Sequence, residues 1–194
     1  MIWTHRGKAI PLTVYHGVPK GWYATEILAE HARLGGKYDI SGPEATEPGA
    51  PSWMPERNAW LQYRQTLYRV ADGVKANDPA CVELAIRYIE LRYIGSYSGF
   101  VRSLLSRRSR HAFLTPEQKE RLHCYFRELI LGGERSVEFN DYFKLWRLLI
   151  TEEQKRELLK EMEARGEQAV KWLSKNLQTN RALRPTSPPA RRRD

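Results

Sequence analysis

Cysteine is scarce in this sequence, which has two among its 194 residues, Cys81 and Cys124. Neither belongs to a Cys-x-x-Cys pair or stands at a zinc-finger spacing from a histidine. The pattern indicates neither a disulfide framework nor a zinc site. We therefore expect two reduced, half-buried thiols and no bound metal.

Long apolar runs are also missing. No stretch approaches the roughly 20 apolar residues of a membrane-spanning helix, and the start, "MIWTHRGKAIPLTVYHG", lacks the continuous apolar segment of a signal peptide. These absences predict a soluble intracellular protein of the cytoplasm that has no membrane partner.

Catalytic motifs are absent as well. The "LGG" sequences at 34–36 and 131–133 lack the Lys-Ser/Thr of a phosphate-binding loop and are typical of helix ends. The histidines occur singly, without HExxH or an i, i+4 pair. Acidic residues alternate with Lys and Arg, as on solvated helix faces, and form no distinct carboxylate pair. The sequence predicts a non-enzyme that needs no cofactor.

What the chain does contain is enough apolar material to fold. Hydrophobic residues make up 41% of it and aromatic residues 11%. From Pro55 onward apolar residues recur at steps of three and four, which predicts a mainly α fold, either a helical bundle or stacked helical hairpins. The first such stripe comprises Trp60, Tyr63, Leu67, Val70, Ala71 and Val74.

The predicted organisation has four parts. Residues 1–34 form a lobe with a short β-hairpin, in which Pro11 restricts its strand to an edge, and one helix. Residues 35–54 are rich in Gly and Pro and form an irregular linker. Residues 55–176 form the helical core domain, and residues 177–194 a disordered basic tail.

Helix starts are well marked in the core domain. Asp78 and Pro79 stand at a predicted N-cap and first helical position. "TPEQKERL" at 115–122 and "TEEQKREL" at 151–158 each begin with a capping box. The two segments match over eight residues, which leaves open a true helical repeat or a chance recurrence of capping boxes.

Basic charge is concentrated in two short stretches. The net charge is +9, yet residues 1–101 and 112–176 are nearly neutral. Residues 102–111 hold four Arg and no acid, and residues 177–194 hold five Arg and one Asp. This asymmetry predicts an acidic partner.

The segment "GFVRSLLSRRSRHAF" at 99–113 is the central functional candidate. We expect Phe100, Leu104 and Leu105 to face the core, while serines 103, 106 and 109 add hydroxyls suited to phosphate oxygens. The candidate binding residues are Arg102, Arg107, Arg108, Arg110, Lys171, Lys175, Arg181, Arg184, Arg191, Arg192 and Arg193.

Three hypotheses fit these residues. The first is a non-catalytic protein that contacts the phosphate backbone of DNA or RNA through the Arg cluster and tail. The second is a helical protein-interaction module, such as an adaptor, inhibitor or assembly subunit, whose arginines meet an acidic protein surface. The third is that the arginines serve solubility alone. A continuous basic face from the cluster to Lys171, Lys175 and Arg181 would favour nucleic acid, and an apolar groove beside an isolated cluster would favour protein.

Overall fold

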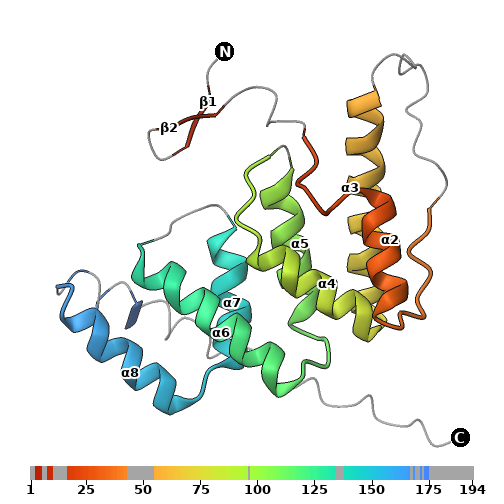
Figure 1. The fold of residues 1–194 in the computed structure, drawn as a ribbon. Helices are drawn as coiled ribbons and strands as arrows, with labels where there is room; N and C mark the ends of the chain where they lie inside the picture. Colours follow the sequence, from red (N-terminus) through yellow and green to blue (C-terminus); the bar gives the residue numbers. More distant parts are fainter. Residues whose placement is uncertain are drawn as a thin grey trace, which may run out of the picture. The chain divides into compact units, whose positions relative to one another are not determined.

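The fold was analysed in a computed structural model that describes residues 3–5, 8–10, 17–42, 55–95, 97–133, 138–166, 168, 171 and 173–174, with side chains from residue 17 onward except 55–57. Over these residues the chain is mostly helical, which confirms the prediction of a mainly α fold (Figure 1). The helices are α2 (Ala24–Arg33), α3 (Pro55–Lys75), α4 (Pro79–Glu90), α5 (Ser98–Ser109), α6 (Pro116–Leu131), α7 (Phe139–Leu149) and α8 (Glu152–Glu163).

Two three-residue strands precede the helices. Strand β1 (Trp3–His5) pairs antiparallel with β2 (Lys8–Ile10), and Trp3 stands opposite Ile10. Pro11 lies outside the described residues. The short N-terminal β-hairpin of the predicted lobe stays a prediction.

Helix α4 lies at the centre of the first part of the fold. It packs against α2, α3, α5 and α6. Its apolar residues point to more than one side, and eight of its twelve residues are buried, including Leu84, Ile86, Tyr88 and Ile89. A helix with neighbours on several sides buries most of its residues, which explains why α4 is rich in apolar residues; its polar residues Glu83, Arg87 and Glu90 lie on the remaining face.

Local sequence signals define where the helices begin. The Asp78 side chain caps α4 by accepting from the Cys81 backbone N–H, and Pro79 follows at the first helical position. Thr115 and Thr151 form the predicted capping boxes of α6 and α8 with glutamines 118 and 154. The apolar stripe of α3 is buried along its length, as predicted.

The chain forms two compact units, Met1–Leu149 and Ile150–Asp194. The boundary lies within the segment 55–176 that we expected to form one core domain. The expected N-terminal lobe falls inside the first unit, where α2 packs against α3 and α4 and buries Ile27. Burial of this apolar face gives α2 a place in the main core.

The predicted linker 35–54 is described as far as Gly42. That part is irregular in conformation, as its glycines suggest, yet Ile40 is 2% exposed and the backbone N–H groups of Lys37 and Tyr38 donate to Asp78. The rest of the linker and the predicted tail at 177–194 lie outside the described residues. Among the helices that the structure describes, none combines the length and apolarity needed to cross a membrane.

Candidate functional site

Arg102, the first arginine of the predicted cluster, lies largely inside the protein. Its side chain is 11% exposed, and its guanidinium forms an ion pair with the Glu138 carboxylate at 3.0 Å. Glu138 is the residue immediately before α7. The guanidinium also donates to the backbone carbonyl of Tyr93 at 2.5 Å. These contacts hold the segment after α4 and the start of α7 against α5, so the sequence-predicted role of Arg102 as a surface contact becomes a structural one.

The next two arginines of α5 stand near acidic residues from other helices. Arg107 lies 3.2 Å from Asp141 of α7, and Arg108 lies 4.0 Å from Asp72 of α3. Both side chains keep roughly two-fifths of their surface in contact with solvent. Arg110 follows at the C-cap and donates weakly to the backbone carbonyl of Arg107. The local excess of positive charge read from the sequence is thus partly balanced by residues far away along the chain.

The prediction of which α5 residues face the core is correct for Leu105, wrong for Phe100, and Leu104 is half-buried. Val101 and Leu105 are buried, but Phe100 is 53% exposed. The buried face also includes Ser98, Ser106 and Ser109. The hydroxyls of Ser106 and Ser109 have no hydrogen-bond partner among the described residues. Small side chains allow α5 to pack closely against α3, α4 and α7. The prediction that these two hydroxyls face phosphate oxygens is therefore wrong.

The remaining predicted binding residues are placed elsewhere or not described. Lys171 is exposed and belongs to the second compact unit. Lys175, Arg181, Arg184, Arg191, Arg192 and Arg193 lie outside the described residues. The described residues therefore do not test whether a continuous basic face joins the cluster to Lys171, Lys175 and Arg181.

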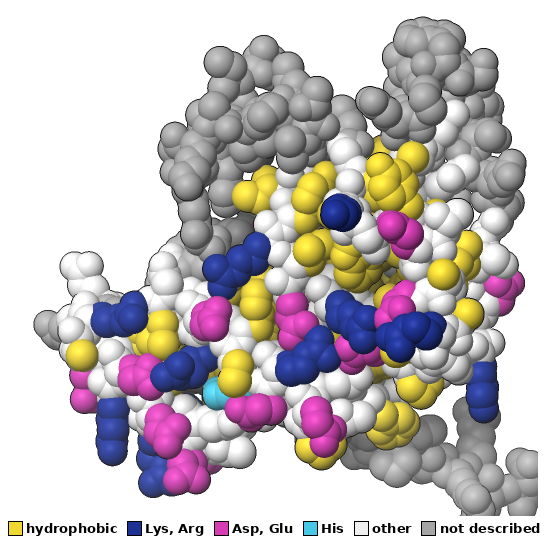
Figure 2. All heavy atoms as spheres, in the orientation of Figure 1, with side chains coloured by type: hydrophobic (Ala, Val, Ile, Leu, Met, Phe, Trp, Pro, Cys, Tyr) yellow, Lys and Arg dark blue, Asp and Glu magenta, His cyan; other side chains and the backbone are white. Residues whose placement is uncertain are grey.

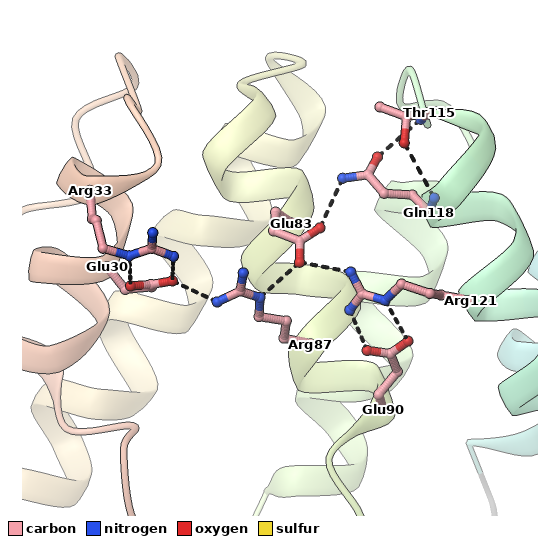
Figure 3. A network of polar contacts seen from close by, with 8 residues as sticks. All are labelled: Glu30, Arg33, Glu83, Arg87, Glu90, Thr115, Gln118 and Arg121. Atoms are coloured by element: carbon pink, nitrogen blue, oxygen red, sulfur yellow. Dashed lines mark hydrogen bonds and ion pairs between the residues drawn. The ribbon is translucent and has the colours of Figure 1, made fainter.

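A second group of charges forms an ion-pair ladder across α2, α4 and α6 (Figure 3). Its members alternate in sign, with neighbouring contacts of 2.5 to 2.8 Å, and are Arg33, Glu30, Arg87, Glu83, Arg121 and Glu90. Gln118 extends the ladder by donating to Glu83 at 3.0 Å. In Figure 2, basic and acidic side chains are interspersed on this face instead of gathering by sign.

The ladder also shifts the pKa values of its carboxyl groups. Hydrogen bonds from the Arg33 side chain lower the pKa of Glu30 to about 2, with a further contribution from Arg87. Burial raises the pKa of Glu83, but hydrogen bonds from Arg121, Gln118 and Arg87 outweigh it and lower the pKa overall. Glu30 and Glu83 therefore stay charged at neutral pH. The ladder combines three Arg with three Glu, so its formal charges cancel.

Three exposed apolar residues lie at a different place, along the connection from α4 to α5 and the first turn of α5. Ile94, Tyr97 and Phe100 have exposed fractions of 39%, 51% and 53%. Tyr97 is the N-cap of α5 and Phe100 is the third helical residue. We call Ile94, Tyr97, Phe100 and the adjoining Arg64 the aromatic patch.

Arg64 enters this patch through contacts with aromatic rings. Its guanidinium carbon lies 4.5 Å from the ring centre of Tyr97 and 5.5 Å from those of Trp60 and Tyr68. The Tyr97 ring in turn lies 5.7 Å from Trp60. Such cation–π contacts fix the direction of a long, otherwise mobile side chain. The exposed ring and the cation are therefore presented together.

Tyr97 has an uncommon backbone conformation. Its φ is +63°, in the left-handed region that glycine and asparagine adopt most easily. A non-glycine residue held there costs of order 1 kcal/mol or more, and such residues are common at functional sites. The exposed ring is thus kept in place at the expense of local stability.

One signal for this patch is present in the sequence, since no Asp or Glu occurs from Leu91 to Pro116. The exposure of Phe100, which we expect from the sequence to face the core, is not signalled. Helical periodicity identifies one face of α5 but does not say which face meets the other helices. The contribution of Arg64, 33 residues before Tyr97, required the tertiary structure.

Another exposed apolar residue lies apart from the patch. Phe113, in the turn before α6, is 85% exposed, and its backbone N–H donates to the Asn77 side chain. Comparison with known proteins adds no assignment to either place, since no family model, curated protein or solved structure is significantly similar to the chain.

Proposed function

We propose that the chain is a non-catalytic helical interaction module that binds an acidic, partly apolar protein segment through the aromatic patch. The observation that carries this proposal is the joint exposure of Ile94, Tyr97 and Phe100 beside the ring-held Arg64. Tyr and Arg are enriched among the residues that dominate protein interfaces. Rigid aromatic rings lose little conformational entropy on binding, so they favour affinity.

Charge complementarity supports an acidic partner. Four of the five Arg between Leu91 and Pro116 lie near carboxylates of other segments, so the cation that the patch itself offers is Arg64. Arg64 contacts aromatic rings and forms no ion pair with a carboxylate among the described residues, so its charge is left for a carboxylate of the partner. A partner segment that carries one or two carboxylates next to apolar side chains matches this combination.

The test is quantitative affinity capture at low salt with the whole chain as bait. The binding variant combines Tyr97→Gly with Phe100→Ser, which removes both exposed rings. The matched control is Phe113→Ser, which removes an even more exposed ring from a different loop. We expect one protein to be recovered in a fixed stoichiometry with the wild-type chain and with the control, and to be lost with the binding variant.

Two further results decide between partners. The captured protein should carry an acidic segment, and substitution of its carboxylates should abolish capture. Nuclease treatment should leave capture unchanged. Recovery that persists in the binding variant, release by nuclease, or the absence of any stoichiometric partner would each contradict the proposal.

Binding to the phosphate backbone of DNA or RNA is the second candidate function. The observation in its favour is that Arg107 and Arg108 remain 41% and 37% exposed in the last turn of α5, next to Arg110. Exposed guanidinium groups at the end of one helix suit phosphate oxygens. The nearby carboxylates of Asp141 and Asp72 compete with phosphate for two of them, which is why this function ranks second.

The nucleic-acid candidate has its own test. Affinity for duplex DNA, single-stranded DNA and RNA is measured over a range of salt concentrations. Each neutralised duplex phosphate contributes about −0.9 to the slope of log affinity against log salt. Replacing Arg107, Arg108 and Arg110 by Ala should flatten the slope by about 2 to 3 in magnitude, while unchanged affinity would remove these residues from the mechanism.

A further inference from the structure

Asp78 is the centre of a buried polar junction between the end of α2, the 36–38 segment and the start of α4. Its Oδ2 atom accepts from the backbone N–H groups of Lys37 at 2.7 Å and Tyr38 at 3.0 Å. Its Oδ1 atom accepts from the Cys81 backbone at 2.9 Å and lies 3.2 Å from Nε2 of His31. A single carboxylate thus joins three separate segments.

Three different kinds of metal ligand meet at this junction. One ligand atom each from His31, Asp78 and Cys81 lies within 4.8 Å of the other two, and all three residues are buried. We propose that His31, Asp78 and Cys81 bind one Zn²⁺ ion. Imidazole nitrogen, carboxylate oxygen and thiolate sulfur are the ligands that zinc takes in proteins.

The separations suit a tetrahedral ion. Two ligands at ordinary zinc distances from one ion are about 3.3 Å apart for nitrogen and oxygen. The observed Nε2 to Oδ1 distance is 3.2 Å. The sulfur needs to come within roughly 3.6 Å of the nitrogen, and the two atoms are at most 4.8 Å apart, so binding requires them to approach by up to about 1.2 Å. A water molecule completes a site with three protein ligands.

The charge balance also suits a buried site. Binding replaces the proton of the Cys81 thiol, which leaves to solvent, and the resulting thiolate and the Asp78 carboxylate neutralise the two positive charges of the ion. A neutral imidazole adds none. A site with no net charge avoids the large free-energy cost of burying an isolated ion.

The surroundings hold the ligands in position. The amides of Lys37 and Tyr38 occupy Oδ2 and leave Oδ1 directed at His31, as outer hydrogen bonds do for metal-bound carboxylates. Gly36 lies against the His31 ring and Gly73 against the Cys81 sulfur so closely that an added methyl group would overlap either one. These two glycines allow the backbone to enclose the junction.

Cobalt substitution tests the proposal with the full chain. Co²⁺ bound by a thiolate has a charge-transfer absorption band that aqueous Co²⁺ lacks. We expect one equivalent of Co²⁺ to give this band, Zn²⁺ to displace it, and saturating Zn²⁺ at about 100 times its Kd to raise the unfolding temperature by roughly 5 °C or more.

The variants are chosen to separate the two thiols. Cys81→Ser should abolish the band, while the matched control Cys124→Ser, which changes the exposed thiol, should keep it. His31→Gln should weaken Co²⁺ binding by more than about tenfold, since loss of even an outer-shell partner often costs that much. Far-ultraviolet circular dichroism checks that each variant is folded.

Three results would overturn the site. They are the absence of a band in the wild-type chain, persistence of the band in Cys81→Ser, and loss of the band in Cys124→Ser. The first of these needs no variant, so the proposal stays falsifiable even where Cys81→Ser does not fold. The zinc site is independent of the aromatic patch, and either can fail alone.

Discussion

Arg102 and Glu138, 36 residues apart in the chain, form an ion pair in which the two side chains are 11% and 14% exposed. The same guanidinium donates to the carbonyls of Leu91 and Tyr93. Arg102, which the charge pattern of the sequence suggested as a binding residue, therefore has a largely buried side chain inside the first compact unit. The pair ties α5 to the start of α7 and to the segment that carries the aromatic patch.

Substituting Arg102 should destabilise the protein strongly. Arg102→Met keeps the length of the side chain but removes the cation from a mostly buried pair, and breaking such a pair typically costs about 3 kcal/mol or more. Arg110→Met, at the exposed end of the same helix, should change the free energy of unfolding by less than about 0.5 kcal/mol. Urea titration monitored by circular dichroism measures both. Equal effects of the two substitutions would be evidence against a structural role for Arg102.

Gly99 should resist replacement by alanine. A methyl group there would overlap the Glu138 carboxylate, which Arg102 holds in place. In open space Gly→Ala in a helix is stabilising by up to about 1 kcal/mol. Here we expect a loss of about 1 to 3 kcal/mol, because the ion pair must shift. The control is Gly42→Ala, whose added carbon meets no atom closer than 3.9 Å. A thermal melt in which Gly99→Ala gains stability would contradict the observed packing.

Acid should remove the stabilising contribution of Asp78. Burial raises the pKa of this carboxyl, but the backbone N–H groups of Lys37, Cys81 and Tyr38 outweigh it and place the pKa well below its ordinary value. A depressed folded-state pKa gives stability that is complete above the unfolded-state value, about 3.9, and is lost as the pH falls below it.

The Asp78→Asn variant isolates this effect. At pH 7 we expect it to lose about 2 kcal/mol, the order of a hydrogen bond to a charged group. The difference from the wild type should shrink as the pH falls from about 5 towards 2. Measurements are made with a chelator present, and the exposed Glu153→Gln of α8 is the control. A difference that stays constant over this range would refute the assignment.

The ion-pair ladder should contribute far less than its number of contacts suggests. Arg121 contacts both Glu83 and Glu90. Its side chain is 40% exposed, and pairs this accessible to water are worth about 1 kcal/mol or less. A double-mutant cycle with Arg121→Met and Glu90→Gln should give a coupling energy in that range which falls further at 1 M salt. The corresponding cycle for Arg102 and Glu138 should give a larger and less salt-sensitive value.

The Tyr97→Gly variant tests whether the Tyr97 ring is needed for the stability of the fold. Glycine adopts the left-handed conformation without penalty, so the substitution relieves strain while it removes the ring contacts with Arg64 and Trp60. These effects are of similar size, about 1 kcal/mol each, and the variant should have nearly wild-type stability. Chemical denaturation checks this expectation. A large destabilisation would show that the Tyr97 ring is needed for folding rather than presented for binding.

The sequence determined the elements of this protein because their signals are local. A proline after Asp78, a Thr-x-x-Gln box at 115 and 151, and apolar residues at helical spacing act through neighbours on the same helix turn, so they predicted the mainly α fold and most helix starts. Charge counting also identified α5 as an acid-free segment. Each of these inferences needs no knowledge of which helices meet.

The tertiary structure decided what the arginines and the polar residues do. Asp72, Glu138 and Asp141 come from other parts of the chain, so the local excess on α5 is balanced in space, where electrostatic energy depends on distance and not on sequence separation. The face of α5 that contains Ser106 and Ser109 packs against α3, α4 and α7, and Phe100 stays exposed. The same long-range packing brings His31 to Asp78, 47 residues later in the chain, and to Cys81 beyond it, a meeting that no spacing in the sequence specifies.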